Sequence, residues 1–157
     1  MGIQEESVLE VAADLCTRVE RRFECDVRAV REGRRLLARA LDDAGLPGGN
    51  PGRSVRDDAL LILSELLSNA VQACREDVAV SIEVHRTWLG LAVRDDSPSP
   101  AVRRRPGPQE IHGRGVDIVA VLSSDWGQTS WDGSGKTVWS RLELPAEVML
   151  VIDCREA

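Results

Sequence analysis

Aromatic side chains are scarce in this sequence of 157 residues, where they make up 3% of the composition. A core must therefore be built mainly from Leu, Val, Ile and Ala. No apolar run approaches the roughly 20 residues that a membrane-spanning helix needs. Residues 1–10 are acidic and lack the basic and apolar regions of a signal peptide. Together these absences predict a protein that stays in the cytoplasm.

Closely spaced cysteines are also missing. The four cysteines, Cys16, Cys25, Cys74 and Cys154, form no Cys-x-x-Cys pair, so the sequence indicates neither a zinc site nor a redox motif. We expect reduced and mostly buried thiols. The net charge of −6 argues against direct binding of nucleic acid as the main function.

What remains is the composition of an ordinary soluble domain, with 43% hydrophobic and 29% charged residues. The length suits one domain with a substantial core. We expect that domain over residues 17–144, after an N-terminal extension (1–16) that is helical over 5–16. Residues 145–157 form a C-terminal extension, in which the apolar run 148–152 predicts an edge strand.

Hydrophobic periodicity predicts two helices in the first half of the domain. After a strand over 17–23, Asp26 is a suitable N-cap for a helix that stops at Gly45. A loop rich in Gly and Pro follows, and Ser54 with Asp57 then suggests a capping box for a second helix. Apolar residues at i+3 and i+4 steps form one stripe along that second helix.

Alternating polar and apolar residues predict strands over 78–85 and 89–93, joined as an antiparallel hairpin. A second hairpin is expected from 125–131 and 136–144, after a short helix that begins near Gly115. This order of elements predicts an α+β fold. We expect a two-layer sandwich of a mixed, mostly antiparallel sheet with helices on one face.

Two short segments carry carboxylate or amide oxygens that could act as a base, a metal ligand or a hydrogen-bond acceptor. On the second helix, Glu65 and Asn69 are four residues apart and share a face roughly opposite the apolar stripe. A carboxylate beside an amide oxygen suits a general base next to a magnesium ligand, although a solvated polar face has the same pattern. Asp95 ends a strand, where a carboxylate can accept a hydrogen bond from the exocyclic amine of adenine. An ordinary Asp-rich turn is the alternative.

Two further segments are rich in glycine. Gly113, Arg114 and Gly115 precede a short helix, and glycines let backbone N–H groups approach phosphates at a helix N-terminus. For a lone Gly-x-Gly, a simple turn is the better explanation. The last segment, 135–139, is a turn that runs into a strand. Each of the four segments is a weak signal alone, whereas their order and spacing together form a strong one.

In this order the four segments resemble the N, G1, G2 and G3 boxes of the GHKL ATPase superfamily, shared by gyrase, the Hsp90 chaperones, histidine kinases and MutL. The closest likeness is to the anti-sigma-factor serine kinases of the RsbW and SpoIIAB type, in their actinobacterial branch. The resemblance covers residues 17–144. It implies the histidine-kinase-type ATPase fold, also called the Bergerat fold, and binding of ATP with Mg²⁺.

The resemblance also implies roles for individual residues. Glu65 would activate the hydroxyl of a partner serine, and Asn69 would ligate Mg²⁺. Asp95 would hold adenine with support from Thr137, while Ser97 stands in the adenine loop where the family usually has glycine. The phosphates would lie against Gly113, Arg114, Gly115 and Val116. Arg34 falls where the family places an arginine that contacts partners, although a solvated helix residue is an equal alternative.

The function implied is that of an anti-sigma regulatory factor. Such a protein sequesters a sigma factor and phosphorylates a serine of an anti-anti-sigma antagonist of the STAS type. We expect no direct nucleic-acid or membrane partner, and a homodimer fits this family. One departure is Ala73, four residues after Asn69, where the family often has histidine. The alternative function is therefore an ATP-binding partner-switching module without useful kinase activity. The detached catalytic part of a histidine kinase is a weaker alternative.

Overall fold

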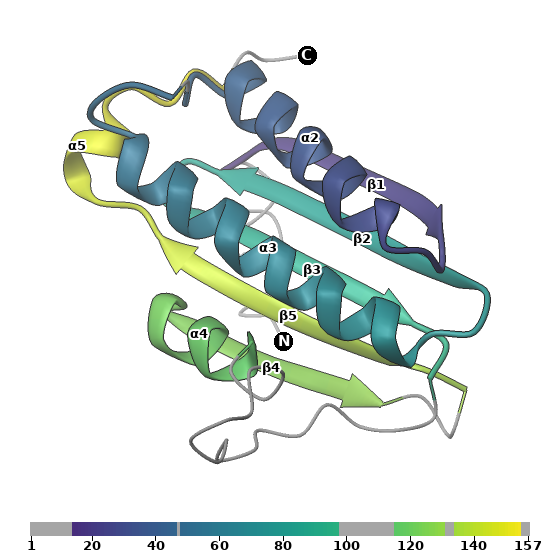
Figure 1. The fold of residues 1–157 in the computed structure, drawn as a ribbon. Coiled ribbons are helices and arrows are strands. Elements are labelled where there is room, and N and C mark those ends of the chain that lie inside the picture. Colours follow the sequence, from purple (N-terminus) through teal and green to yellow (C-terminus); the bar gives the residue numbers. More distant parts are fainter. Residues whose placement is uncertain (1–13, 47, 98–114, 131–133, 155–157) are drawn as a thin grey trace, which may run out of the picture.

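A five-stranded sheet forms one layer of the molecule (Figure 1). The computed structural model describes residues 14–46, 48–97, 115–130 and 134–154, so the helix expected over 5–16 lies largely outside the described residues. The strands are β1 (Leu15–Glu24), β2 (Asp77–His85), β3 (Trp88–Asp95), β4 (Asp125–Ser130) and β5 (Lys136–Glu143). Their order across the sheet is β1-β2-β3-β5-β4, and each of the four pairings is antiparallel.

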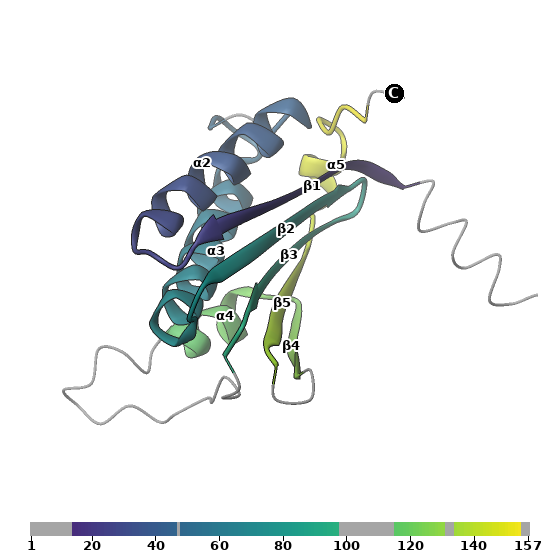
Figure 2. The ribbon, with the colours of Figure 1, turned by 90° about the vertical axis from the view of Figure 1, so that its right-hand side faces the viewer.

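Helices make up the second layer, and they lie on one face of the sheet (Figure 2). The helices are α2 (Arg28–Asp43), α3 (Arg53–Ala73), α4 (Gly115–Leu122) and the single turn α5 (Ala146–Met149). In Figure 1, α3 runs along the middle of the sheet with α2 on one side and α4 on the other. The predicted α+β two-layer sandwich is confirmed, with an antiparallel sheet throughout its described part.

The ends of α2 follow from local backbone chemistry. The helix begins at Arg28, so Val27 rather than Asp26 takes the N-cap position. Asp26 nevertheless satisfies a free donor of the first turn, because its Oδ1 accepts the Arg28 N–H at 2.8 Å. At the other end Gly45 has φ +83°, a left-handed conformation that glycine adopts without strain, and the chain leaves the helix there as predicted.

The expected capping box of α3 is wrong. This helix begins at Arg53 after Gly52, and no side chain caps it. Ser54 therefore lies within the first turn and not ahead of it. Asp57 has its carboxylate 3.9 Å from Arg53 Nε, an exposed pair one helical turn apart.

The core lies between the two layers. Strand residues alternate between buried and partly exposed, so the sheet buries only the face toward the helices. On that face the buried side chains of β2 and β3, such as Ile82 and Leu91, belong to one apolar cluster with Leu63 and Leu67 of α3. No described helix is both long enough and apolar enough to cross a membrane.

Two expectations about the termini and cysteines need correction. The run 148–152 does not add an edge strand, because α5 and the residues after it fold back on α2, and Asp153 N–H bonds to Ala44 O at 3.0 Å. All four cysteines are paired as disulfides, Cys16 with Cys154 and Cys25 with Cys74. The sequence gave no sign of this pairing, because Cys16 in β1 and Cys25 directly after β1 meet partners that are remote in the sequence.

Candidate functional site

Glu65 and Asn69 lie on one flank of α3, at the margin of its buried face. Both are half-buried, whereas the sequence placed them opposite the apolar stripe. Ser64 lies on the flank toward α2, since its Oγ accepts a hydrogen bond from Arg34 of that helix at 2.6 Å. Helical spacing turns Glu65 and Asn69 away from α2, toward the side where α4 packs (Figure 1).

Arg34 has a partner within the chain. Its guanidinium donates to Ser64 Oγ, and that hydroxyl in turn donates to the Leu60 carbonyl at 2.7 Å. The residue is exposed on α2, as a contact for another protein would have to be. The structure therefore places Arg34 at the α2–α3 seam, on the flank of α3 away from Glu65.

Asp95 is the most completely buried carboxylate that the sequence singled out. It ends β3, and 1% of its side chain is exposed. Its Oδ2 lies 2.9 Å from Nζ of Lys136, of which 2% is exposed, and its Oδ1 accepts the Ser97 N–H at 2.8 Å. The buried carboxylate thus has both a counter-charge and a hydrogen bond, which offset the cost of removing it from water.

Sheet register explains why Asp95 and Lys136 meet. The two residues are direct partners across the antiparallel pair β3–β5, so their side chains lie on the same face, toward the helices. Gly135 precedes Lys136, and a Cβ at this glycine would overlap the Asp95 carbonyl oxygen. The strand can therefore approach the end of β3 closely only because residue 135 is glycine.

Asp96 joins the end of β3 to the end of α3. Its two carboxylate oxygens accept the N–H groups of Arg75 and Glu76, at 2.6 and 2.8 Å, just beyond the helix. These backbone hydrogen bonds, that from Arg75 above all, hold the pKa of Asp96 below its usual range. The adjacent carboxylates thus have separate partners: Asp95 pairs with Lys136 on β5, and Asp96 accepts from the backbone just after α3.

The glycine-rich segment is described only in part. Gly113 and Arg114 lie outside the described residues, and Gly115 and Val116 begin α4, which packs beside α3. Asp117 adds a carboxylate to the first turn of this helix. A negative side chain there interacts favourably with the helix dipole, as a phosphate would.

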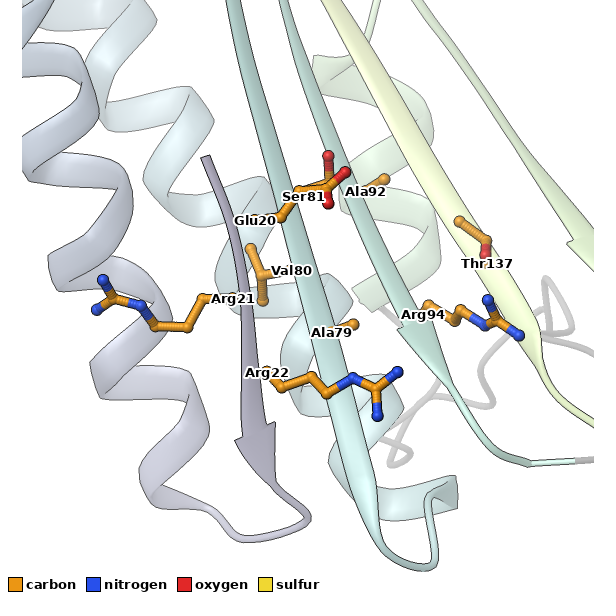
Figure 3. A pocket seen from close by; sticks show the side chains of 9 residues that line it. All are labelled: Glu20, Arg21, Arg22, Ala79, Val80, Ser81, Ala92, Arg94 and Thr137. Atoms are coloured by element: carbon orange, nitrogen blue, oxygen red, sulfur yellow. The ribbon is translucent and has the colours of Figure 1, made fainter. Parts of the chain in front are cut away.

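Thr137 does not share the Asp95 site. It follows Lys136 on β5, and strand alternation turns its side chain to the opposite face of the sheet. Figure 3 shows it there, in a hollow of about 580 Å³ whose lining also includes Ser81, Ala92 and Arg94. The structure brings Lys136, and not Thr137, to the Asp95 carboxylate.

Lys136 and Asp96 are the contacts that sequence reasoning missed. Lys136 is the only lysine of the chain and stands directly before Thr137. The sequence did not show that residue 136 lies opposite residue 95 in the sheet, and this register is what identifies Lys136 as the partner of Asp95. Within the described part of the chain, no three His, Cys, Asp or Glu side chains gather to hold a metal ion.

The fold and these contacts define an α+β protein with an open antiparallel sheet and a buried ion pair at one end of it. Comparison with protein-family models and with curated proteins found no match.

Proposed function

We propose that this protein binds ATP and acts as an anti-sigma regulatory factor in the cytoplasm. The observation that carries the proposal is the buried Asp95 carboxylate at the end of β3. A carboxylate offers about four acceptor positions, and its two contacts within the chain leave acceptor capacity for a further donor. The exocyclic amine of adenine is a donor of this kind.

The flank of α3 supports the proposal further. Glu65 and Asn69 lie half-buried on the side of this helix where α4 begins with Gly115. Mg²⁺ in nucleotide sites is held largely by phosphate oxygens and water, so one or two side-chain oxygens suffice. Asn69 is the residue of this flank that we expect to ligate the ion. Glu65 would accept the proton of the attacking hydroxyl.

The regulatory role rests on the resemblance of the four segments to the anti-sigma-factor serine kinases. We expect a sigma factor as the sequestered partner and a STAS-type antagonist as the phosphorylated one. A specific residue favours a second candidate, a partner-switching module without kinase activity. Ala73 lies one helical turn beyond Asn69 and offers no side-chain donor beside the expected base.

Nucleotide binding is the first test. Titration calorimetry with Mg-ATP should show binding by the wild type, and Asp95→Asn should weaken it by about 1–3 kcal/mol, because a buried donor loses a charged acceptor. The exposed Asp125→Asn on β4 is a matched control and should bind as the wild type does. A folded wild type that binds no nucleotide at millimolar ATP contradicts the proposal.

Phosphate transfer separates the two candidate functions. With radiolabelled ATP and the antagonist, Glu65→Gln should retain nucleotide affinity while transfer to the antagonist serine falls by roughly 10²–10⁴-fold. Glu76→Gln, an exposed carboxylate beyond the same helix, serves as the control. Undetectable transfer by the wild type, with nucleotide binding intact, would leave the module without kinase activity as the function.

A further inference from the structure

Lys136 is a buried cation for which the proposed function has no role. Its side chain is 2% exposed, and its ammonium lies 2.9 Å from Asp95 Oδ2. An ammonium carries three N–H donors, and among the described residues Asp95 is its one polar partner. The buried Lys136 ammonium therefore has donor capacity left for a ligand.

The two residues together present a donor directly beside an acceptor. Asp95 has acceptor positions left after its contacts with Lys136 and Ser97, and Lys136 has N–H groups left after its contact with Asp95. The adenine edge has the complementary pattern, with the exocyclic amine as donor next to the ring nitrogen N1 as acceptor. One buried ion pair can thus satisfy both groups at once.

We propose that Lys136 recognises the base together with Asp95, by donating to N1 of adenine while Asp95 accepts from the exocyclic amine. This inference rests on the proposed binding of ATP. It assigns to Lys136 the supporting role that the sequence gave to Thr137, whose side chain lies on the opposite face of the sheet (Figure 3).

Energetics favours a paired arrangement over either residue alone. A lone buried carboxylate or ammonium is costly, whereas a charge with several hydrogen bonds is tolerated in the interior. Donors and acceptors left unmatched in a buried site also penalise ligands that lack the complementary group. A base whose edge lacks this donor beside an acceptor should therefore bind poorly. Lys136 would then contribute to the choice of base as well as to affinity.

The test compares ATP with 1-deaza-ATP, in which a C–H replaces N1, by titration calorimetry. The wild type should bind 1-deaza-ATP about 10- to 100-fold more weakly than ATP, because a charged donor loses its acceptor. In Lys136→Met the two nucleotides should bind within about threefold of each other. Arg141→Met removes a cation from the same strand and should keep the wild-type ratio, since Arg141 packs over Trp88.

Lys136→Met leaves a buried carboxylate without its cation and could fail to fold. In that case the doubly substituted Asp95→Asn, Lys136→Met chain, which has no buried charge at this pair, supplies the same ratio. Equal affinity of the wild type for ATP and 1-deaza-ATP overturns the role of Lys136 and leaves ATP binding standing. Tighter binding of GTP than ATP overturns adenine recognition by the pair. A wild type that binds none of these nucleotides overturns the proposed function itself.

Discussion

Asp58 lies on the same flank of α3 as Glu65 and Asn69, about two turns before the first and three turns before the second. Burial disfavours its charged form and the neighbouring Asp57 adds like-charge repulsion, so the pKa of Asp58 is raised. A carboxyl group whose pKa is higher in the folded than in the unfolded chain favours folding while it is protonated. That advantage is lost as the pH rises from its unfolded pKa through its folded pKa.

Asp58→Asn should therefore stabilise the protein at neutral pH. We expect a gain of roughly 0.5 kcal/mol or less, because solvent screens a site that is only partly buried. The gain should disappear as the pH falls below the pKa of Asp58, where the wild-type carboxyl is already neutral. Urea unfolding of both chains across this pH range is the measurement.

The control for this substitution is Asp57→Asn. That carboxylate is exposed and lies 3.9 Å from Arg53 Nε, so its loss should not stabilise the helix. Equal stabilisation by Asp57→Asn and Asp58→Asn would mean that negative charge at this end of α3 matters, and not the burial of Asp58.

Single residues also show where sequence reasoning stops. Glu65, Asn69 and Asp95 could be singled out as candidates because spacing along a helix and position at a strand end are local properties of the sequence. Lys136 was not found, because its partner depends on which residues of β3 and β5 oppose one another. A shift of that register by one residue would place Thr137, and not Lys136, on the face of Asp95.

At the scale of elements, hydrogen bonds of Asp96 connect the end of β3 to the end of α3. Its carboxylate holds the backbone N–H groups of Arg75 and Glu76 just beyond α3, which fixes the end of the helix that carries Asn69 relative to the end of β3. Because the pKa of Asp96 is lowered in the folded protein, its contribution to stability is present above the unfolded pKa. It is lost as the pH falls through the folded pKa.

Asp96→Ala should destabilise the protein by about 1–2 kcal/mol at pH 7, because two backbone donors lose a charged acceptor and turn to water. Hydrogen exchange of the Arg75 and Glu76 amides should accelerate. The loss of stability relative to the wild type should shrink in acid, as protonation removes the same contacts from the wild type.

Glu76→Ala is the matched control for Asp96→Ala, since it removes a neighbouring exposed carboxylate and retains the backbone donor. Unchanged exchange at Arg75 and Glu76 in Asp96→Ala would contradict the role of Asp96 in holding these two elements together.

Elements differ in how far the sequence predicts them. The hairpin β2–β3 was expected because its alternation repeats every two residues and its turn is short. The strand order, in which β5 lies between β3 and β4, depends on pairings between distant segments and has no local signal. The run 148–152, whose first two residues end α5, was taken for a strand because five apolar residues in a row fit either structure.

At the scale of the whole molecule, disulfides join β1 and the residue directly after it to two remote parts of the chain. Cys16 and Cys154 have Cα atoms 4.5 Å apart across 138 residues of sequence, and those of Cys25 and Cys74 lie 6.0 Å apart across 49. Both Cα separations are within the range that a disulfide spans. Cys74 also directly follows α3 and precedes the two amides that Asp96 holds.

Oxidised protein should therefore contain two disulfides, and its intact mass should be lower than that of the reduced chain by four hydrogen atoms. Peptide mapping without reduction should find Cys16 joined to Cys154 and Cys25 to Cys74. Four thiols labelled in the unfolded, oxidised protein would contradict the pairing. The protein is treated with a low-molecular-weight disulfide before mapping, so that thiols reduced during preparation are reoxidised.

Reduction should lower the free energy of unfolding, because each cross-link restricts the unfolded chain. We expect about 2–5 kcal/mol for each bond, with the larger effect for Cys16–Cys154, whose loop of 138 residues is the longer. The two serine pairs, Cys16→Ser with Cys154→Ser and Cys25→Ser with Cys74→Ser, separate the contributions when unfolded by urea without reductant. If Cys25→Ser with Cys74→Ser proves more destabilising than Cys16→Ser with Cys154→Ser, loop entropy of the unfolded chain is not the main cause. The Cys25–Cys74 bond then acts mainly in the folded protein, where Cys74 lies next to the end of α3 and the amides held by Asp96.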